Sequence, residues 1–165
     1  MSIIENYLAP SSIDDAAAAL AAGPATIVAG GTDLMLQTGS GQKAYAPTLL
    51  NIQKITKMRG VSQDGNTIRI GALTTITDLL TDPIIAEHLP VLATMADKFA
   101  SDQIRNAGTV GGNICNASPA GDSLVPLLMY KAEAVLVATN DSRKVPLAEF
   151  FTGPGETVRQ ENELL

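Results

Sequence analysis

A short apolar segment that runs directly into two glycines is the feature that most constrains the fold of this chain. Residues 25–29 have the length and β-branched character of a buried strand, and Gly30-Gly31 follows without a spacer. The next residues, 32–37, have a helical pattern. Glycines at such a turn allow positive φ and close approach of another group, while the free N–H groups of a helix start suit a phosphate. The segment therefore predicts an α/β unit with a ligand-binding turn.

The flanking residues extend this unit. A serine cap and two acids at 11–15 open an alanine-rich helix that ends at Gly23-Pro24, and residues 48–52 form a second short apolar run. Helix, strand, helix and strand then follow one another within residues 1–54, with parallel strands expected. We expect Met35 and three other methionines, Met58, Met95 and Met129, to fill the core.

The pattern changes after residue 54. Residues 108–122 are rich in Gly, Asn, Ser and Pro and lack periodicity, which predicts an irregular loop. The remaining elements expected here are a turn at 64–66 with a strand at 67–71, two or three short helices between 75 and 100 broken at Pro83 and Pro90, a helix at 124–130, a hairpin of 133–139 with 143–146, and an open loop from 153.

A second glycine-centred segment, residues 108–113, could form another nest of N–H groups. Neither segment matches G-x-G-x-x-G or a P-loop, and each taken alone is also typical of a structural turn. Two such loops without basic neighbours favour a pyrophosphate held by uncharged N–H dipoles. Asp122 follows the second loop and has two interpretations: it accepts hydrogen bonds from ribose or polyol hydroxyls, or it caps the helix at 124–130.

Composition excludes several classes of function. The 165 residues carry 17 acids against 11 bases, a net charge of −6, and no basic stripe, which argues against a nucleic-acid or anionic-membrane surface. No apolar run approaches the ~20 residues of a membrane span, and no signal-peptide pattern opens the chain. With one cysteine, Cys115, and one histidine, His88, we expect neither an internal disulfide nor a metal site, and a cytoplasmic location.

Two segments, 27–34 and 103–114, resemble the FAD-binding subunit of the molybdenum hydroxylases, the family of xanthine dehydrogenase and the carbon monoxide dehydrogenase medium subunit. The residues at 68–72, 117–122 and 152–155 fit as well, so the similarity covers the whole chain in order. The resemblance implies an α+β, two-subdomain FAD-binding fold of the vanillyl-alcohol-oxidase (PCMH) type. It divides into a small α/β subdomain, 1–54, and a larger α+β subdomain with an antiparallel sheet, 55–165, truncated before the C-terminal domain that family members have.

The same resemblance implies which residues contact FAD. Residues 27–34 would line its pyrophosphate and adenine side, and Gly112 would contact the pyrophosphate through its backbone. The full set of implied cofactor-binding residues is Ile27, Val28, Ala29, Gly30, Gly31, Thr32, Asp33, Leu34, Phe99, Ala100, Ile104, Thr109, Gly111, Gly112, Asn113, Cys115, Asn116, Gly121 and Asp122.

In the resembled enzymes, electrons pass from iron–sulfur clusters of a small partner subunit through FAD to NAD or another acceptor. Molybdopterin and the substrate belong to a large partner subunit. The resemblance thus implies an oxidoreductase subunit without acid–base catalytic residues of its own, because the flavin supplies the chemistry. The alternative is a truncated, non-catalytic assembly module of such a complex that has lost FAD.

The end of the sequence carries a separate expectation. Leu164-Leu165 are apolar, and apolar surface of this kind is typical of interfaces, although simple fraying of the terminus is the other interpretation. We expect residues after about 155 to be disordered or packed against another chain, and the protein to self-associate or bind partner subunits.

Overall fold

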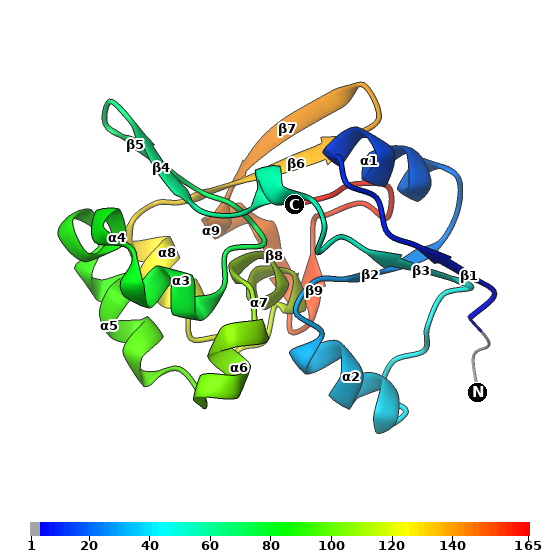
Figure 1. Cartoon of the computed structure of the whole chain (residues 1–165), viewed down its shortest axis with the longest axis horizontal. Helices are drawn as coiled ribbons and strands as arrows, with labels where there is room; N and C mark the ends of the chain where they lie inside the picture. Colours follow the sequence, from blue (N-terminus) through cyan, green and yellow to red (C-terminus); the bar gives the residue numbers. More distant parts are fainter. Residues whose placement is uncertain (1–3) are drawn as a thin grey trace.

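The computed structural model describes residues 4–165, and its first part is a three-stranded parallel sheet in the order β1-β3-β2 (Figure 1). The parallel pairing of β2 and β3 confirms the sequence prediction, whereas β1 was not predicted. Its three residues are all exposed, so only its pairing with β3 marks it as a strand. The elements of this part are β1 (Asn6–Leu8), α1 (Ile13–Ala21), β2 (Ala25–Val28), α2 (Thr32–Gly39) and β3 (Thr48–Asn51).

Helix α1 begins where the sequence predicts. The Ser12 hydroxyl accepts a hydrogen bond from the Asp15 amide at 3.1 Å, and the two acids of the first turn suit the helix dipole. Three residues of one face, Ala16, Ala17 and Leu20, are buried. The alanine-rich sequence thus lets this helix lie close to strand β6 (Glu133–Ala138).

The second part consists of short helices and two-stranded antiparallel hairpins. Both predicted helix breaks are confirmed: Pro83 opens α4 behind an Asp82 cap, and Pro90 opens α5. The elements are η1 (Thr56–Met58), β4 (Val61–Asp64), β5 (Thr67–Ile70), α3 (Ile76–Thr81), α4 (Pro83–His88), α5 (Pro90–Lys98), α6 (Asp102–Ala107), α7 (Val110–Asn116), α8 (Leu124–Met129), β6 (Glu133–Ala138), β7 (Asp141–Pro146), α9 (Leu147–Phe150), β8 (Phe151–Gly153) and β9 (Glu156–Thr157).

Three expectations about this part are corrected. The segment predicted as an irregular loop contains helix α7, which Thr109 caps by accepting from the Gly112 amide. The open loop expected from residue 153 is the β8–β9 hairpin. Met35 and Met129 are 63% and 55% exposed, so they do not fill the core, while Met58 is buried as expected.

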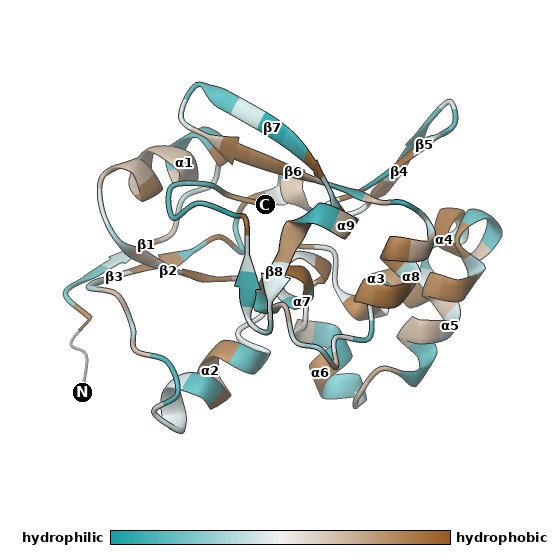
Figure 2. Cartoon of the chain, turned by 180° about the vertical axis from the view of Figure 1, so that it is seen from behind, coloured by the Kyte–Doolittle hydropathy of each residue, from teal (hydrophilic) through white to brown (hydrophobic). Residues whose placement is uncertain are grey.

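The C-terminal residues 156–165, here called the strap, pack against their own chain, so the expectation of disorder is wrong, while a contact with another chain stays a prediction. Leu164 forms an antiparallel bridge with Val137 of β6, with N···O distances of 2.7 and 2.8 Å. Figure 2 shows why β6 receives it: the strand is apolar while β7 beside it is polar. The apolar end of the sequence therefore finds its partner within the chain.

Two hydrophobic clusters make the core. One joins the first sheet to the segment after it, and the other holds the short helices against the β6–β7 hairpin. Buried members of the first cluster are Ala16, Leu20, Leu50, Ile52, Ile55, Met58, Leu73 and Leu164. The division into subdomains at residue 54 stays a prediction. No helix within residues 4–165 is long and apolar enough to cross a membrane.

Candidate cofactor-binding site

The two glycine segments singled out in the sequence meet in space. A Cβ atom on Gly30 would lie 2.0 Å from the Ala107 carbonyl oxygen, and one on Gly111 would lie 2.8 Å from the Ala72 oxygen. Such distances are far inside van der Waals contact, so glycine is required at both positions by the close approach of another segment of the chain. These glycines bring the start of α2 beside the start of α7.

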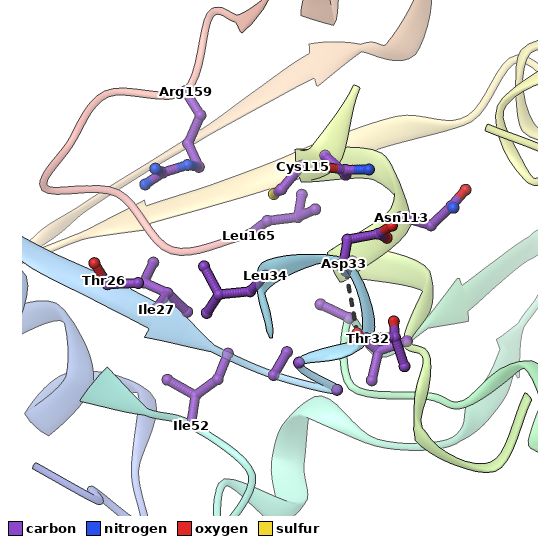
Figure 3. A pocket seen from close by; sticks show the side chains of 18 of the residues that line it. Thr26, Ile27, Thr32, Asp33, Leu34, Ile52, Asn113, Cys115, Arg159 and Leu165 are labelled. Atoms are coloured by element: carbon purple, nitrogen blue, oxygen red, sulfur yellow. Dashed lines mark hydrogen bonds between the residues drawn. The ribbon is translucent and has the colours of Figure 1, made fainter. Parts of the chain in front are cut away.

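A cleft of about 430 Å³ opens where these segments meet (Figure 3). Its walls come from the end of β2, the first turn of α2, helix α7 and the strap. Figure 3 shows Arg159 and Leu165 of the strap above Ile27 and Leu34. The volume is in the range of small-molecule and cofactor sites, roughly 300–1,000 Å³.

The start of α2 presents unsatisfied N–H groups to this cleft. Gly31 occupies the cap position with φ of +76°, a conformation that favours glycine, and it offers no side-chain oxygen. Its carbonyl accepts from the Met35 amide at 3.0 Å, which leaves the amides of the first turn, residues 32–34, without an intrahelical partner. Together with the helix dipole, these amides suit the phosphate groups of a cofactor.

The start of α7 is different, because its amides are already used. The Val110 and Gly111 amides donate to the carbonyls of Thr74 and Ala72, at 3.0 and 2.8 Å, and the Gly112 amide donates to the Thr109 hydroxyl at 3.1 Å. The expected second nest of free N–H groups is therefore absent from this segment of the described chain. The segment still lines the cleft, and Gly111 and Gly112 can do so only through backbone atoms, because they have no side chain.

Apolar side chains gather on the cleft walls between these polar groups. They provide a surface on which an aromatic ring can pack, and they come from four regions of the sequence, near residues 27–34, 52, 99 and 164–165. They are Ile27, Leu34, Ile52, Phe99, Leu164 and Leu165.

Two basic side chains that were not predicted from the sequence also line the cleft. Lys43 lies on the loop after α2, and Arg159 lies on the strap, where its Nη1 donates to the carbonyls of Gln160 and Glu163 at 2.9 and 2.7 Å. The interpretation of glycine loops without basic neighbours is thus corrected by tertiary structure. No local signal marked either residue, since Lys43 follows Gly31 beyond a whole helix and Arg159 stands far from both glycine segments along the chain.

The same two cations lie near the Cys115 thiol. Burial raises the pKa of this thiol above its ordinary value, and the charges of Arg159 and Lys43 partly oppose that rise. The thiol is thus mainly protonated at neutral pH, which disfavours a nucleophilic role.

Most of the residues implied by the family resemblance line this cleft. Those brought together are Ile27, Ala29, Gly30, Gly31, Thr32, Asp33, Leu34, Phe99, Thr109, Gly111, Gly112, Asn113, Cys115 and Asn116. Those outside its lining are Val28, Ala100, Ile104, Gly121 and Asp122.

Asp122 does not cap α8, so that interpretation is wrong, and its contact with ribose or polyol hydroxyls stays a prediction. Its side chain is exposed, and the residue at the cap position of α8 is Ser123. Ser123 instead donates to Asn113 Oδ1 at 2.6 Å and thereby orients one cleft residue. Within residues 4–165, no group of three or more His, Cys, Asp or Glu side chains is placed to hold a metal ion.

A parallel sheet that ends in an uncapped helix start, beside a cleft lined by apolar side chains, two bases and two acids, defines a domain that binds a nucleotide-containing cofactor. The chain belongs to the family described as "FAD binding domain in molybdopterin dehydrogenase", whose model matches residues 3–165.

Relatives of known name agree with this assignment. The chain is 37% identical to the xanthine dehydrogenase FAD-binding subunit of Escherichia coli O157:H7, over 97% of this chain and 55% of that protein. It is 36% identical to the carbon monoxide dehydrogenase medium chain of Hydrogenophaga pseudoflava, over 96% and 56% of the two chains. The chain therefore spans about half the length of these relatives.

Solved structures give the same result for the fold. A chain of carbon monoxide dehydrogenase from Hydrogenophaga pseudoflava superposes with a TM-score of 0.94 at 35% identity, covering 100% of this chain and 58% of that one. Quinoline 2-oxidoreductase from Pseudomonas putida 86 superposes with a TM-score of 0.92 at 26% identity, covering 96% and 56%. The fold is the α+β FAD-binding fold expected from the sequence.

Proposed function

We propose that this chain holds FAD in the cleft between α2 and α7, as the flavin-binding part of a molybdenum-containing dehydrogenase. The observation that carries the proposal is the uncapped first turn of α2, whose three backbone amides without an intrahelical partner belong to residues that line a cleft with both apolar and polar side chains. Phosphates at the amides and an aromatic ring on the apolar walls match the two chemical halves of a flavin nucleotide.

Each part of the cleft then has a defined role. The amides of residues 32–34 bind the pyrophosphate, Lys43 and Arg159 add positive charge, and Asn113 and Asn116 offer amide groups to ribityl or ribose hydroxyls. A bound flavin supplies the electron transfer, and the chain itself binds, orients and shields it. We keep the nineteen-residue set implied by the family as candidate contacts, with those outside the cleft lining as the weakest members.

The wider role that we propose follows the relatives. The chain would work beside a molybdopterin-binding large subunit and an iron–sulfur small subunit, passing electrons from the clusters to NAD or another acceptor. A single cysteine suits a reducing compartment, and the cytoplasm is the location that we propose. The alternative is an assembly module that keeps the fold without FAD.

Titration of the purified chain with FAD tests the proposal, followed by flavin absorbance and by equilibrium dialysis. We expect binding of one FAD per chain. Leu34→Asp should weaken it by roughly tenfold, because a carboxylate would stand beside the phosphates. Leu36→Asp is the matched control, because Leu36 is 71% exposed on the same helix and does not line the cleft. This variant should bind FAD with the wild-type affinity.

Two results would overturn the proposal. A folded chain that stays colourless after dialysis against excess FAD would favour the assembly module. Equal losses in the two aspartate variants would show that the phosphates do not lie at the α2 terminus.

A further inference from the structure

Helix α2 is the wall of the cleft that has the least packing to hold it. It lies wholly within the described chain and has no buried residue, and Met35 and Leu36 stand 63% and 71% exposed. Figures 1 and 2 both show it at the lower edge of the molecule. Its position therefore depends on a few specific contacts.

Glycines in the left-handed region flank this helix. Gly31 at its start has φ of +76°, and Gly41 just after its end has φ of +77°. A Cβ atom on Gly41 would meet nothing within 4 Å, so the turn there is open. Residues of this kind absorb changes in φ and ψ at low cost, which makes the two glycines suitable hinges.

One side-chain hydrogen bond connects α2 to the opposite wall. Gln37 Nε2 donates to Asn116 Oδ1 at 2.8 Å, although the residues lie 79 positions apart in the sequence. Both residues line the cleft, one on the last turn of α2 and the other at the end of α7. Among residues 4–165, the other side-chain hydrogen bonds of α2 stay within the helix and the loop that follows it.

We propose that Gln37 and Asn116 form a latch that holds α2 closed over the cofactor and sets the rate at which the cofactor leaves. The inference rests on the proposed function, because it assigns the cofactor to the same cleft. Ligand contacts along the first turn of α2 keep the helix in place at one end, and the latch fixes the other end. Opening the latch lets α2 turn about its flanking glycines and widens the cleft. Gln37 is thus a positioning residue, since it acts on the cofactor through α2.

The first test measures FAD release by stopped flow from the wild type and from Gln37→Leu. The variant should release FAD about 2- to 12-fold faster, which is the net contribution of one hydrogen bond, 0.5–1.5 kcal/mol, expressed as a ratio of rates. Gln42→Leu is the matched control, because Gln42 is exposed on the loop after α2 and should leave the release rate unchanged.

A double-mutant cycle separates the latch from a direct contact of Asn116 with the cofactor. If the two amides act through each other, Gln37→Leu combined with Asn116→Leu should release FAD no faster than the more affected single variant. Effects that multiply would mean that the residues act independently, and the latch would be rejected.

A second measurement does not need FAD. Cys115, the single cysteine, lines the cleft beside the latch, so a thiol reagent should label it several-fold faster in ligand-free Gln37→Leu than in Gln42→Leu. Equal labelling rates would overturn the latch. A wild-type chain that fails to bind FAD would overturn the proposed function instead, and the labelling rates would still decide whether the latch exists.

Discussion

Cys115 gives the cleft a chemical reporter at the scale of one residue. Because burial raises the pKa of its thiol, the reactive thiolate is scarce at neutral pH, and its labelling by iodoacetamide should rise with pH beyond the ordinary cysteine range near 8.5. At pH 8, saturating FAD should slow the labelling by roughly tenfold or more, since the cofactor would cover this wall. Mass spectrometry of the labelled chain measures both effects, with Cys115→Ser as the blank.

An unchanged labelling rate at saturating FAD would place the cofactor away from α7. The prediction is specific because the sequence contains one cysteine, so every label reports on the same wall of the cleft.

The site could be predicted from the sequence wherever the signal was local. Gly31 lies at the predicted turn between a strand and a helix, where its positive φ favours glycine, and it lines the cleft. Lys43 and Arg159 could not be found in this way, since only the folding of two distant loops brings them to the cleft. Gly30 and Gly111 were singled out in the sequence as glycines that let a ligand approach the backbone. In the structure, they instead make room for another segment of the chain.

At the scale of elements, α1, α4 and α5 were predicted from signals at their ends, whereas α7 was not predicted. Helix α1 has a serine cap and first-turn acids, and α4 and α5 begin at prolines. Helix α7 begins with Val110 and a glycine pair, which have weak helix propensity. It is stabilised by burial of Val110 and Ile114 and by the Thr109 cap, and burial cannot be read from composition alone.

The close contact between the β2–α2 turn and the end of α6 gives a prediction about stability. Gly30→Ala should lower the free energy of unfolding by about 1–3 kcal/mol or prevent folding, because the added methyl group meets the rigid Ala107 carbonyl. Gly39→Ala, at the end of α2 with open space around it, should be neutral or stabilising by up to about 1 kcal/mol. Urea denaturation measures both variants, and equal stabilities would contradict the packing role of Gly30.

At the scale of the whole molecule, the strap ties the two hydrophobic clusters together. Leu164 belongs to the cluster around the first sheet, while Val158 and Leu165 pack against the other one. The sequence suggested an intermolecular contact here because two terminal leucines are typical of an interface. The hydrogen-bonding partner, Val137, lies within the chain, and only the tertiary fold reveals it.

An ion pair fixes the strap, and it links the stability of the molecule to pH. Glu163 is buried and accepts from Arg143 Nε at 2.6 Å and Nη2 at 2.9 Å, and from the Gln160 amide at 2.7 Å. The hydrogen bonds from Arg143 hold the pKa of Glu163 below its ordinary value, assisted by the Gln160 amide and by the charge of Arg159, while burial opposes them. Arg143 also donates to the Val158 carbonyl at 2.7 Å, so the pair joins both ends of the strap to β7.

The sign of the pH effect follows from this lowered pKa. In the unfolded chain the carboxyl has an ordinary pKa near 4.3, so on acidification the unfolded state takes up the proton first. The pair therefore contributes stability above about pH 5, and this contribution is lost as the pH falls through the folded-state pKa. Glu163→Gln should lower the Tm at pH 7 by several degrees, because each kcal/mol of lost stability corresponds to about 2–4 °C at this chain length. The difference in Tm from the wild type should shrink toward pH 4.

The control is Glu161→Gln, at an exposed neighbouring residue without an ion pair in the described chain. This variant should keep the wild-type profile of Tm against pH. Calorimetry between pH 4 and 8 measures all three chains, and identical profiles for the two variants would show that the strap is held by its apolar contacts alone.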